Sequence, residues 1–434
     1  MPNHFRWHTD TRLHWPSQSA TQHTFDSLHD NTATPHEIML ISDACSVTCF
    51  TALQYAIQHR RAFCIHPQNA SFSATIPPQK ETDGYFQTIS SGSSGTPKRI
   101  RRTQASWITS FQINTTQAQI TPEDSYAILG KLSHSTPLYA TLEAAHIGAD
   151  IHVLSDLRPD HQRQALSHLQ STILYATPTQ LRLLCKQRHH HVPERFAVRL
   201  ILSGGGKLDA HTAALVHQTF VGATVIEFYG AAETSFITLS DHHTPIGSVG
   251  KAYPKVQIRI DPPDTDGDLA GKIWVKSPYL FTDYAVSNSL EPPKYAATWR
   301  DGFLSVGEYG YQDKQGYLFL SGRQSRRINI ADQLVHPEEI ELLLLANPAV
   351  EQCAIVPVTD TQRGQVLMGL VVLSCETMSA DNICQELLAT LRQQPGNLIT
   401  PRKLFPVESL PKLASGKVDL VAATELVRSL YEAT

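Results

Sequence analysis

Short apolar runs alternate with amphipathic segments along the first half of the chain, and this alternation limits the possible folds more than any other feature. Ile38–Ile41 is typical of a buried strand, Ser46–His59 of a helix and Ala62–Ile65 of the next strand. A strand, a helix and a strand in this order predict a parallel sheet with a right-handed crossover. The alternation continues with apolar runs at residues 126–129, 150–154, 173–176, 199–202 and 224–228.

A loop rich in small residues follows a further predicted strand at Phe86–Ser90. Hydroxyl residues and glycines precede one lysine, Lys98, in the order Ser90, Ser91, Gly92, Ser93, Ser94, Gly95 and Thr96. Such residues let backbone N–H groups turn toward an anion, so the loop suits a polyphosphate. It is not a Walker A loop, in which the lysine directly follows the second glycine. Taken alone, the same composition is as typical of a flexible linker.

Two further stretches follow predicted strands. Ligands of doubly wound sheets bind beyond the carboxyl ends of the strands. We therefore expect Ser203–Gly206 and Tyr229–Glu233 to lie at the same edge of the sheet as the loop. The basic run Arg99–Arg102 is open to two interpretations, a solvated helix start or additional support for phosphates.

From Gly247 onward the pattern changes to short strands separated by turn residues, which predicts a small antiparallel or barrel-like unit. After a basic joint at Gln324–Arg327, a helix at Pro337–Leu345 and two apolar strands indicate a compact α+β tail. The predicted fold is therefore α/β, with an N-terminal core domain over residues 1–323 and a mobile α+β domain over residues 324–434. The core domain combines parallel and mixed sheets with helices.

Composition excludes several classes of protein. With a net charge of −4, the chain has no overall field that favours nucleic acid or an anionic membrane. The 21 histidines show no His-Glu-x-x-His spacing, and His189–His191 is typical of a solvated loop. Seven cysteines without a Cys-x-x-Cys pair indicate reduced thiols. Since no signal peptide and no run of about 18 apolar residues is evident, we expect a cytoplasmic protein.

Five stretches occur in the order and at the spacing of the adenylate-forming superfamily of acyl-CoA synthetases, carrier-protein ligases, nonribosomal adenylation domains and luciferases. Ser90–Lys98 resembles its phosphate loop, and Tyr229–Glu233 resembles its Tyr-Gly-x-Thr-Glu motif. Gly247–Lys251 is similar to the turn that follows. Asp301–Glu308, with Arg323, resembles the ribose-contacting segments, and Pro411–Lys417 the closing motif with the catalytic lysine. The resemblance extends over residues 38–419.

The resemblance implies that ATP and Mg²⁺ activate a carboxylic acid to an acyl-adenylate with release of pyrophosphate. A phosphopantetheine thiol then takes the acyl group. Lys417 would bridge the carboxylate and the α-phosphate, and Glu233 would hold Mg²⁺. Arg326 would lie in the hinge about which the small domain rotates. Other residues expected around the nucleotide are Gly204, Gly205, Gly206, Tyr229, Gly230, Ala231, Ala232, Glu308 and Arg323.

The acid and the acceptor follow less directly from the resemblance. His134 and Ser135, with Gly204 and Gly230, would line the acyl pocket, and no aspartate is present there to pair with an amino group. The chain resembles most the small ligases of aryl-polyene or pigment clusters, which load an aryl or acyl acid onto an acyl carrier protein. An acid:CoA ligase is the alternative, and a non-catalytic nucleotide-binding relative is a second one.

Several positions depart from the family pattern. Arg99 and Ala232 stand where glycine and threonine are usual, and Glu308 stands where aspartate is usual. Arg326 replaces the aspartate or lysine of the hinge. Asn329 and Asp332 replace a lysine and a glycine, and that glycine normally lines the thiol tunnel, so the second half-reaction is in question. The chain ahead of the phosphate loop is also short, which predicts a reduced first subdomain.

Overall fold

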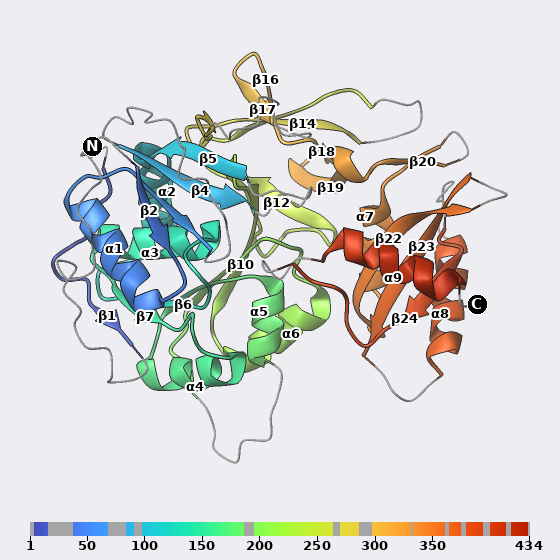
Figure 1. Cartoon of the computed structure of the whole chain (residues 1–434), viewed down its shortest axis with the longest axis horizontal. Coiled ribbons are helices and arrows are strands. Elements are labelled where there is room, and N and C mark those ends of the chain that lie inside the picture. The colour runs from blue at the N-terminus through green and yellow to red at the C-terminus, as the bar shows by residue number, and fades with distance from the viewer. Residues whose placement is uncertain are drawn as a thin grey trace.

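The computed structural model describes residues 4–15, 38–67, 84–90, 98–185, 195–263, 270–285, 297–330, 333–360, 364–374, 379–393, 400–413 and 418–432. Figure 1 shows a larger body of sheets and helices (blue to light orange) and a smaller C-terminal body (orange to red) to one side of it. No helix in these ranges is long and apolar enough to cross a membrane.

The first half of the large sheet is parallel, as the alternation predicts. Its strands lie in the order β1-β7-β6-β8-β9-β10 and every neighbouring pair is parallel. Their bounds are β1 Leu13–His14, β6 Ser125–Ile128, β7 Asp150–Val153, β8 Ile173–Ala176, β9 Leu200–Ser203 and β10 Thr224–Ala231. The intervening helices are α3 Ser135–Ile147, α4 Pro159–Leu169, α5 Pro178–Cys185 and α6 Ala210–Thr219. Strand β1 was not predicted, because residues 1–35 show little periodicity.

The predicted antiparallel strands continue this same sheet. From β10 the order runs β11-β12-β19-β18-β14-β17-β16, with β13 beside β14, so the path is open rather than a separate closed barrel in the described ranges. The bounds are β11 Ser235–Leu239, β12 Ser248–Ala252, β13 Gln257–Ile260, β14 Gly271–Lys276, β16 Thr298–Arg300, β17 Phe303–Ser305, β18 Glu308–Gln312 and β19 Tyr317–Arg323.

A second sheet carries the strands on either side of the predicted phosphate loop. Its order is β15-β5-β4-β3-β2, formed by β2 Met39–Ser42, β3 Phe63–His66, β4 Tyr85–Ser90, β5 Lys98–Thr103 and β15 Asp283–Tyr284. Helices α1 Ser46–Gln58 and α2 Gln104–Gln117 follow β2 and β5. Buried residues of both sheets share one apolar core, which includes Phe63 and Phe86 of the second sheet and Ile151 and Tyr175 of the large sheet.

The basic run Arg99–Arg102 is a β-strand, so the expectation of a helix start there is wrong. Each of its residues pairs with a residue of β4, from Arg99↔Ile89 to Arg102↔Phe86. The sheet accommodates so many charged side chains because residues on the neighbouring strands β4 and β15 form hydrogen bonds with them. The Nε atom of Arg101 donates to Asp283 at 2.7 Å, and that of Arg99 to Gln87 at 2.8 Å.

The C-terminal body has its own core. Strands β22 Val350–Asp360, β23 Gly364–Leu373 and β24 Lys403–Pro406 form a sheet covered by α7 Pro337–Leu345, α8 Ala380–Arg392 and α9 Leu420–Glu432. A two-stranded ribbon, β20 Ile328–Ile330 and β21 Gln333–Val335, precedes it. Helix α8 buries Ile383, Leu387 and Leu391 at the spacing of one helix face.

We refer to residues 4–323 as the N-terminal unit and to residues 328–432 as the C-terminal unit. None of the buried clusters in the described part of the chain contains residues of both units. The short 3₁₀ turn Gln324–Arg326 lies between them. The predicted domain boundary falls on this turn, and the division into two domains stays a prediction.

Candidate active site

A cleft of about 1870 Å³ lies between the two units. Residues from the carboxyl ends of the parallel strands line one side of it, and residues of α7, β22 and α9 line the other. The cleft thereby gathers many of the residues predicted from sequence: Lys98, His134, Ser135, Gly205, Gly206, Gly230, Ala231, Ala232, Glu233, Glu308, Arg323 and Arg326. Their catalytic and binding roles stay predictions.

Strands β4 and β5 bring the two ends of the predicted phosphate loop together. Ser90 at the end of β4 pairs with Lys98 at the start of β5. The Nζ atom of Lys98 lies 5.5 Å from the centre of the Tyr284 ring, on strand β15. The loop residues Ser91, Gly92, Ser93, Ser94, Gly95 and Thr96 lie outside the described residues.

Glu233, the predicted magnesium ligand, is oriented by a tyrosine that the sequence did not reveal. The hydroxyl of Tyr284 donates a hydrogen bond to Glu233 Oε1 at 2.9 Å, and burial raises the pKa of this phenol. The backbone carbonyl of Glu233 accepts from the amide of Phe281 at 2.8 Å. Tyr284 lies in no recognisable motif, and it reaches the cleft because β15 pairs with β5.

Arg102 braces the segment that carries Glu233. Its guanidinium is fully buried and donates to Ser235 Oγ at 2.6 Å, to the carbonyl of Tyr279 at 3.2 Å and to the carbonyl of Ala232. Burial lowers the pKa of Arg102 to about 10, against the opposing effect of Glu233. Since all these acceptors belong to the protein, Arg102 fixes strand β5 against Ala232–Ser235. Support of phosphates by the basic run Arg99–Arg102 stays a prediction.

The predicted Tyr-Gly motif lies within strand β10 rather than in a turn after it. The pairing of β10 with β11 shifts register between Tyr229 and Gly230. A Cβ atom on Gly230 would lie 1.9 Å from the carbonyl oxygen of Ser235, so only glycine fits this bulge. The hydroxyl of Tyr229 is buried and has no hydrogen-bond partner within the described ranges.

Glu308 and Arg323 form an ion pair on neighbouring strands. The Nε atom of Arg323 donates to Glu308 Oε1 at 2.7 Å, and the two residues are paired in the β18–β19 ladder. The Glu308 side chain is only 8% exposed, whereas that of Arg323 is 46% exposed. A nearly buried carboxylate beside an arginine at the cleft can accept hydrogen bonds from ribose hydroxyls. Glutamate can do so although it is longer than the aspartate that is usual at this position.

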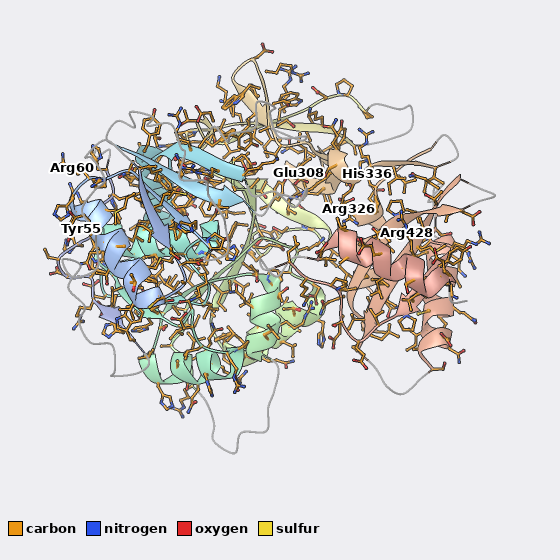
Figure 2. The ribbon with its side chains drawn as sticks, in the orientation of Figure 1. Tyr55, Arg60, Glu308, Arg326, His336 and Arg428 are labelled. Atoms are coloured by element: carbon orange, nitrogen blue, oxygen red, sulfur yellow. The ribbon has the colours of Figure 1, made fainter. Side chains whose placement is uncertain are left out.

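The predicted hinge residue Arg326 is bound firmly into the C-terminal unit. Its guanidinium donates two hydrogen bonds to Glu341 of α7, at 2.9 and 2.7 Å, and one to the carbonyl of Ile355 at 3.0 Å. Glu338 lies 3.5 Å away and accepts from the Arg323 amide at 3.3 Å. Figure 2 shows Glu308, Arg326 and His336 close to the boundary of the two units. Burial raises the pKa of Glu338 to about 6.

The closing motif precedes α9, and its described part reaches the cleft. Lys412 and Val418 form an antiparallel bridge, and both line the cleft. The predicted catalytic Lys417 and the tunnel residue Asp332 lie outside the described residues. His134 is the N-cap residue of α3, and Ser135 is the first residue of that helix.

Charge and space in the cleft fit a nucleotide with a magnesium ion. Mg²⁺ usually binds through one or two carboxylates together with phosphates and water. Glu233 supplies such a carboxylate in the cleft that Lys98 also lines, whereas the described residues contain no cluster of three His, Cys, Asp or Glu that could hold a metal on its own. When bound, the ion would neutralise phosphate charge.

Comparison with known proteins identifies the class of protein. The model of the AMP-binding enzyme family matches residues 18–285, and that of the AMP-binding enzyme C-terminal domain matches residues 339–417. The chain therefore belongs to the AMP-binding enzyme family, which confirms the predicted adenylate-forming superfamily and α/β fold. The predicted enzyme class, an acid–thiol ligase, is confirmed with it.

Two curated relatives and one solved structure illustrate the similarity. The uncharacterized acyl–CoA ligase YhfT of Bacillus subtilis (strain 168) is 29% identical over 79% of this chain and 68% of that protein. The putative long chain fatty acid–CoA ligase VraA of Staphylococcus aureus (strain COL) is 27% identical over 79% of this chain and 70% of that protein. The structure of o-succinylbenzoate CoA synthetase (MenE) from Bacillus subtilis, in complex with an acyl-adenylate intermediate, has a TM-score of 0.64 and 25% identity, covering 77% of this chain and 68% of that one.

Proposed function

We propose that this protein is an acid:CoA ligase. It would activate a carboxylic acid with ATP to an acyl-adenylate and then transfer the acyl group to the thiol of CoA. The observation that carries the proposal is the family match together with relatives that are named as CoA ligases. The carrier protein expected from sequence finds no support in these names, so CoA is the proposed acceptor.

The proposed chemistry assigns a task to each side of the cleft. The carboxylate oxygen attacks the α-phosphorus of ATP, the bond to pyrophosphate breaks, and the acid gains a good leaving group. Because charge builds up on the phosphates, positioning and electrostatics supply most of the catalysis. Lys98 and Lys417 would offset this charge, Glu233 would hold Mg²⁺, and Glu308 with Arg323 would bind the ribose. Tyr229 would lie beside the adenine.

Acid-dependent exchange between ATP and pyrophosphate tests the first half of the reaction. We expect exchange with at least one acid from a panel of benzoates, cinnamates and fatty acids, and its loss in Lys417→Ala. Lys314→Ala serves as the control, because Lys314 is an exposed lysine in the turn between β18 and β19. If ATP binds but no acid supports exchange, the protein is a nucleotide-binding relative without this activity.

Thioester formation tests the second half. The acid that supports exchange is incubated with ATP and either CoA or a phosphopantetheinylated acyl carrier protein, and the acyl thioester is measured by mass spectrometry. The proposal predicts the faster reaction with CoA. A faster reaction with the carrier protein would overturn the acceptor but leave adenylation intact.

A further inference from the structure

Aromatic rings form the deep wall of the cleft. Five of its lining residues share this character: Trp107, Tyr139, Tyr175, Phe228 and Phe236. Four are between 3% and 5% exposed, and Phe228 is half-buried. The ring of Tyr139 lies 5.1 Å from those of Trp107 and Phe236, between ring centres, and Phe228 lies 5.0 Å from Phe236. The rings therefore form one continuous apolar surface.

The polar ends of the two tyrosines are bound within the fold. The hydroxyl of Tyr175 donates to Glu143 Oε2 at 2.6 Å. The hydroxyl of Tyr139 is hydrogen-bonded to Ser110 Oγ at 2.7 Å and to the amide nitrogen of Asn114 at 3.0 Å. The tyrosines therefore contribute apolar ring surface to the cleft, because their hydroxyls are engaged elsewhere.

A buried carboxylate holds this arrangement in place. Glu143 is fully buried and accepts from Asn114 at 2.9 Å and from Tyr126 at 3.1 Å, in addition to Tyr175. Asn114 is joined in turn to the hydroxyl of Tyr253 at 2.7 Å. Four of these side chains lie behind the wall and do not line the cleft: Glu143, Asn114, Tyr126 and Tyr253. Within the described ranges the wall therefore does not open into a tunnel.

Backbone packing makes the wall hard to displace. A Cβ atom on Gly204 would lie 2.3 Å from the Phe228 ring, so the end of β9 presses directly on that ring. The wall also excludes a chain that must extend deep into the protein, because large rings fill the space behind the acyl position. A flat ring, in contrast, can pack edge-to-face against such rings.

We infer that the acid is a compact aromatic carboxylic acid and that Glu143 is a positioning residue for the wall that selects it. The inference rests on the proposed function and narrows it. Glu143 does not touch the acid; it fixes the rings of Tyr175 and Tyr139, and the rings contact the acyl group. We therefore expect a long-chain fatty acid to be the poorer substrate.

The wild-type enzyme provides the first test. We expect kcat/KM in pyrophosphate exchange to be at least about tenfold higher for the best of benzoate, phenylacetate, cinnamate and indole-3-acetate than for propionate, hexanoate, octanoate or palmitate. An aliphatic acid that equals or exceeds all the aromatic acids overturns the inference, while the proposed function stands. Absence of exchange with every acid contradicts the proposed function itself.

Two matched substitutions test the wall. Tyr175→Leu and Tyr126→Leu each remove one phenol that donates to Glu143, but only Tyr175 lines the cleft. We expect the preference for the aromatic acid over octanoate to fall at least about tenfold in Tyr175→Leu and to fall much less in Tyr126→Leu. Equal changes in both variants would mean that the wall does not select the acid.

Glu143→Gln tests the positioning role through a separate readout. Glutamine keeps the size of the side chain but has one oxygen in place of two, so the phenols behind the wall are held less well. We expect the KM for the aromatic acid to rise about threefold or more while the KM for ATP stays unchanged. Equal rises in both values would indicate a general structural role and would contradict the assignment. The wild-type preference remains decisive if a variant does not fold.

Discussion

Two buried acidic clusters in this protein are built in opposite ways. Behind the wall of the cleft, Glu143 is surrounded by phenols and an amide, and no cation from the described residues pairs with it. At the boundary of the two units, Glu338 and Glu341 surround the guanidinium of Arg326. The first cluster satisfies its carboxylate with neutral donors. The second depends on opposite charges, and it leaves Glu338 Oε2 buried without a hydrogen bond from the described residues.

The difference matches what each region has to do. A carboxylate that neutral donors hold from α2, β6 and β8 joins elements of a single unit, so it stiffens a surface that must keep its shape. An ion-pair cluster depends strongly on geometry, because a buried charge that loses its partner is costly. Such a cluster suits a joint, where the arrangement of two units must be well defined.

Arg326→Met should have the largest effect. It leaves Glu341 and Glu338 buried without their cation, and breaking a buried pair in this way costs about 3–5 kcal/mol. Urea unfolding should show a lower midpoint for the C-terminal unit. Arg326→Lys, which keeps the charge but loses the paired hydrogen bonds, should fall between this variant and the wild type. An unchanged midpoint in Arg326→Met would show that the cluster does not support the joint.

The pH dependence of stability should reveal the raised pKa of Glu143. Burial raises the pKa of Glu143 to about 7, against the hydrogen bonds that it accepts. A raised carboxyl pKa stabilises the fold below the ordinary pKa of 4.5, and this contribution is lost as pH rises through about 7. Relative to Glu143→Gln, the unfolding free energy of the wild type should therefore fall by about 3 kcal/mol over that window. A parallel pH dependence of the two proteins would contradict the raised pKa.

Glu338 should show a smaller dependence in the same direction. Burial raises its pKa to about 6, and Arg326 opposes the rise. Relative to Glu338→Gln, the wild type should lose about 2 kcal/mol between pH 4.5 and 6.5. In an Arg326→Met background this window should extend to higher pH, because the opposing cation is gone. No extension would mean that the two residues are not coupled.

Arg182→Gln should produce the smallest change and should act on the orientation of the two units. Arg182 on α5 donates across the cleft to the carbonyl of Glu351 at 3.1 Å, and it also pairs with Asp209 at 2.6 Å. Loss of this cross-link, about 1 kcal/mol, should reduce pyrophosphate exchange about fivefold. Arg163→Gln is the control, because Arg163 also donates to a backbone carbonyl, that of Leu184, but within the N-terminal unit. Equal effects in both variants would exclude a specific role in orientation.

The sequence predicted those parts of the fold whose signal is local. The apolar runs of the parallel strands and the helix Pro337–Leu345 are confirmed, because side-chain periodicity alone specifies them. Strand β5 was missed because its charges are satisfied by Asp283 and by carbonyls more than 100 residues away. Helix α9 was not predicted, although it is amphipathic and buries Ala423 and Val427.

The residues of the candidate site also divide into those with a local sequence signal and those without one. Motif residues such as Glu233, Glu308 and Arg323 could be predicted and lie together at the cleft. Tyr284 and the Glu143 network could not, because single tyrosines, an asparagine and a glutamate on separate elements carry no signal until the fold joins them. Long-range hydrogen bonds between such residues are invisible to sequence periodicity.

The buried Arg102 has a consequence for the chain as it emerges during synthesis. Its acceptors lie 130 to 177 residues further along, and strand β15, which covers the edge of β5, begins only at Asp283. A nascent chain that ends before these residues would hold a cation without acceptors and a sheet edge without its neighbour, both of which are unfavourable. Four of the five strands of this sheet lie in the first quarter of the protein. The sheet nevertheless cannot be completed until the chain has been synthesised as far as Asp283.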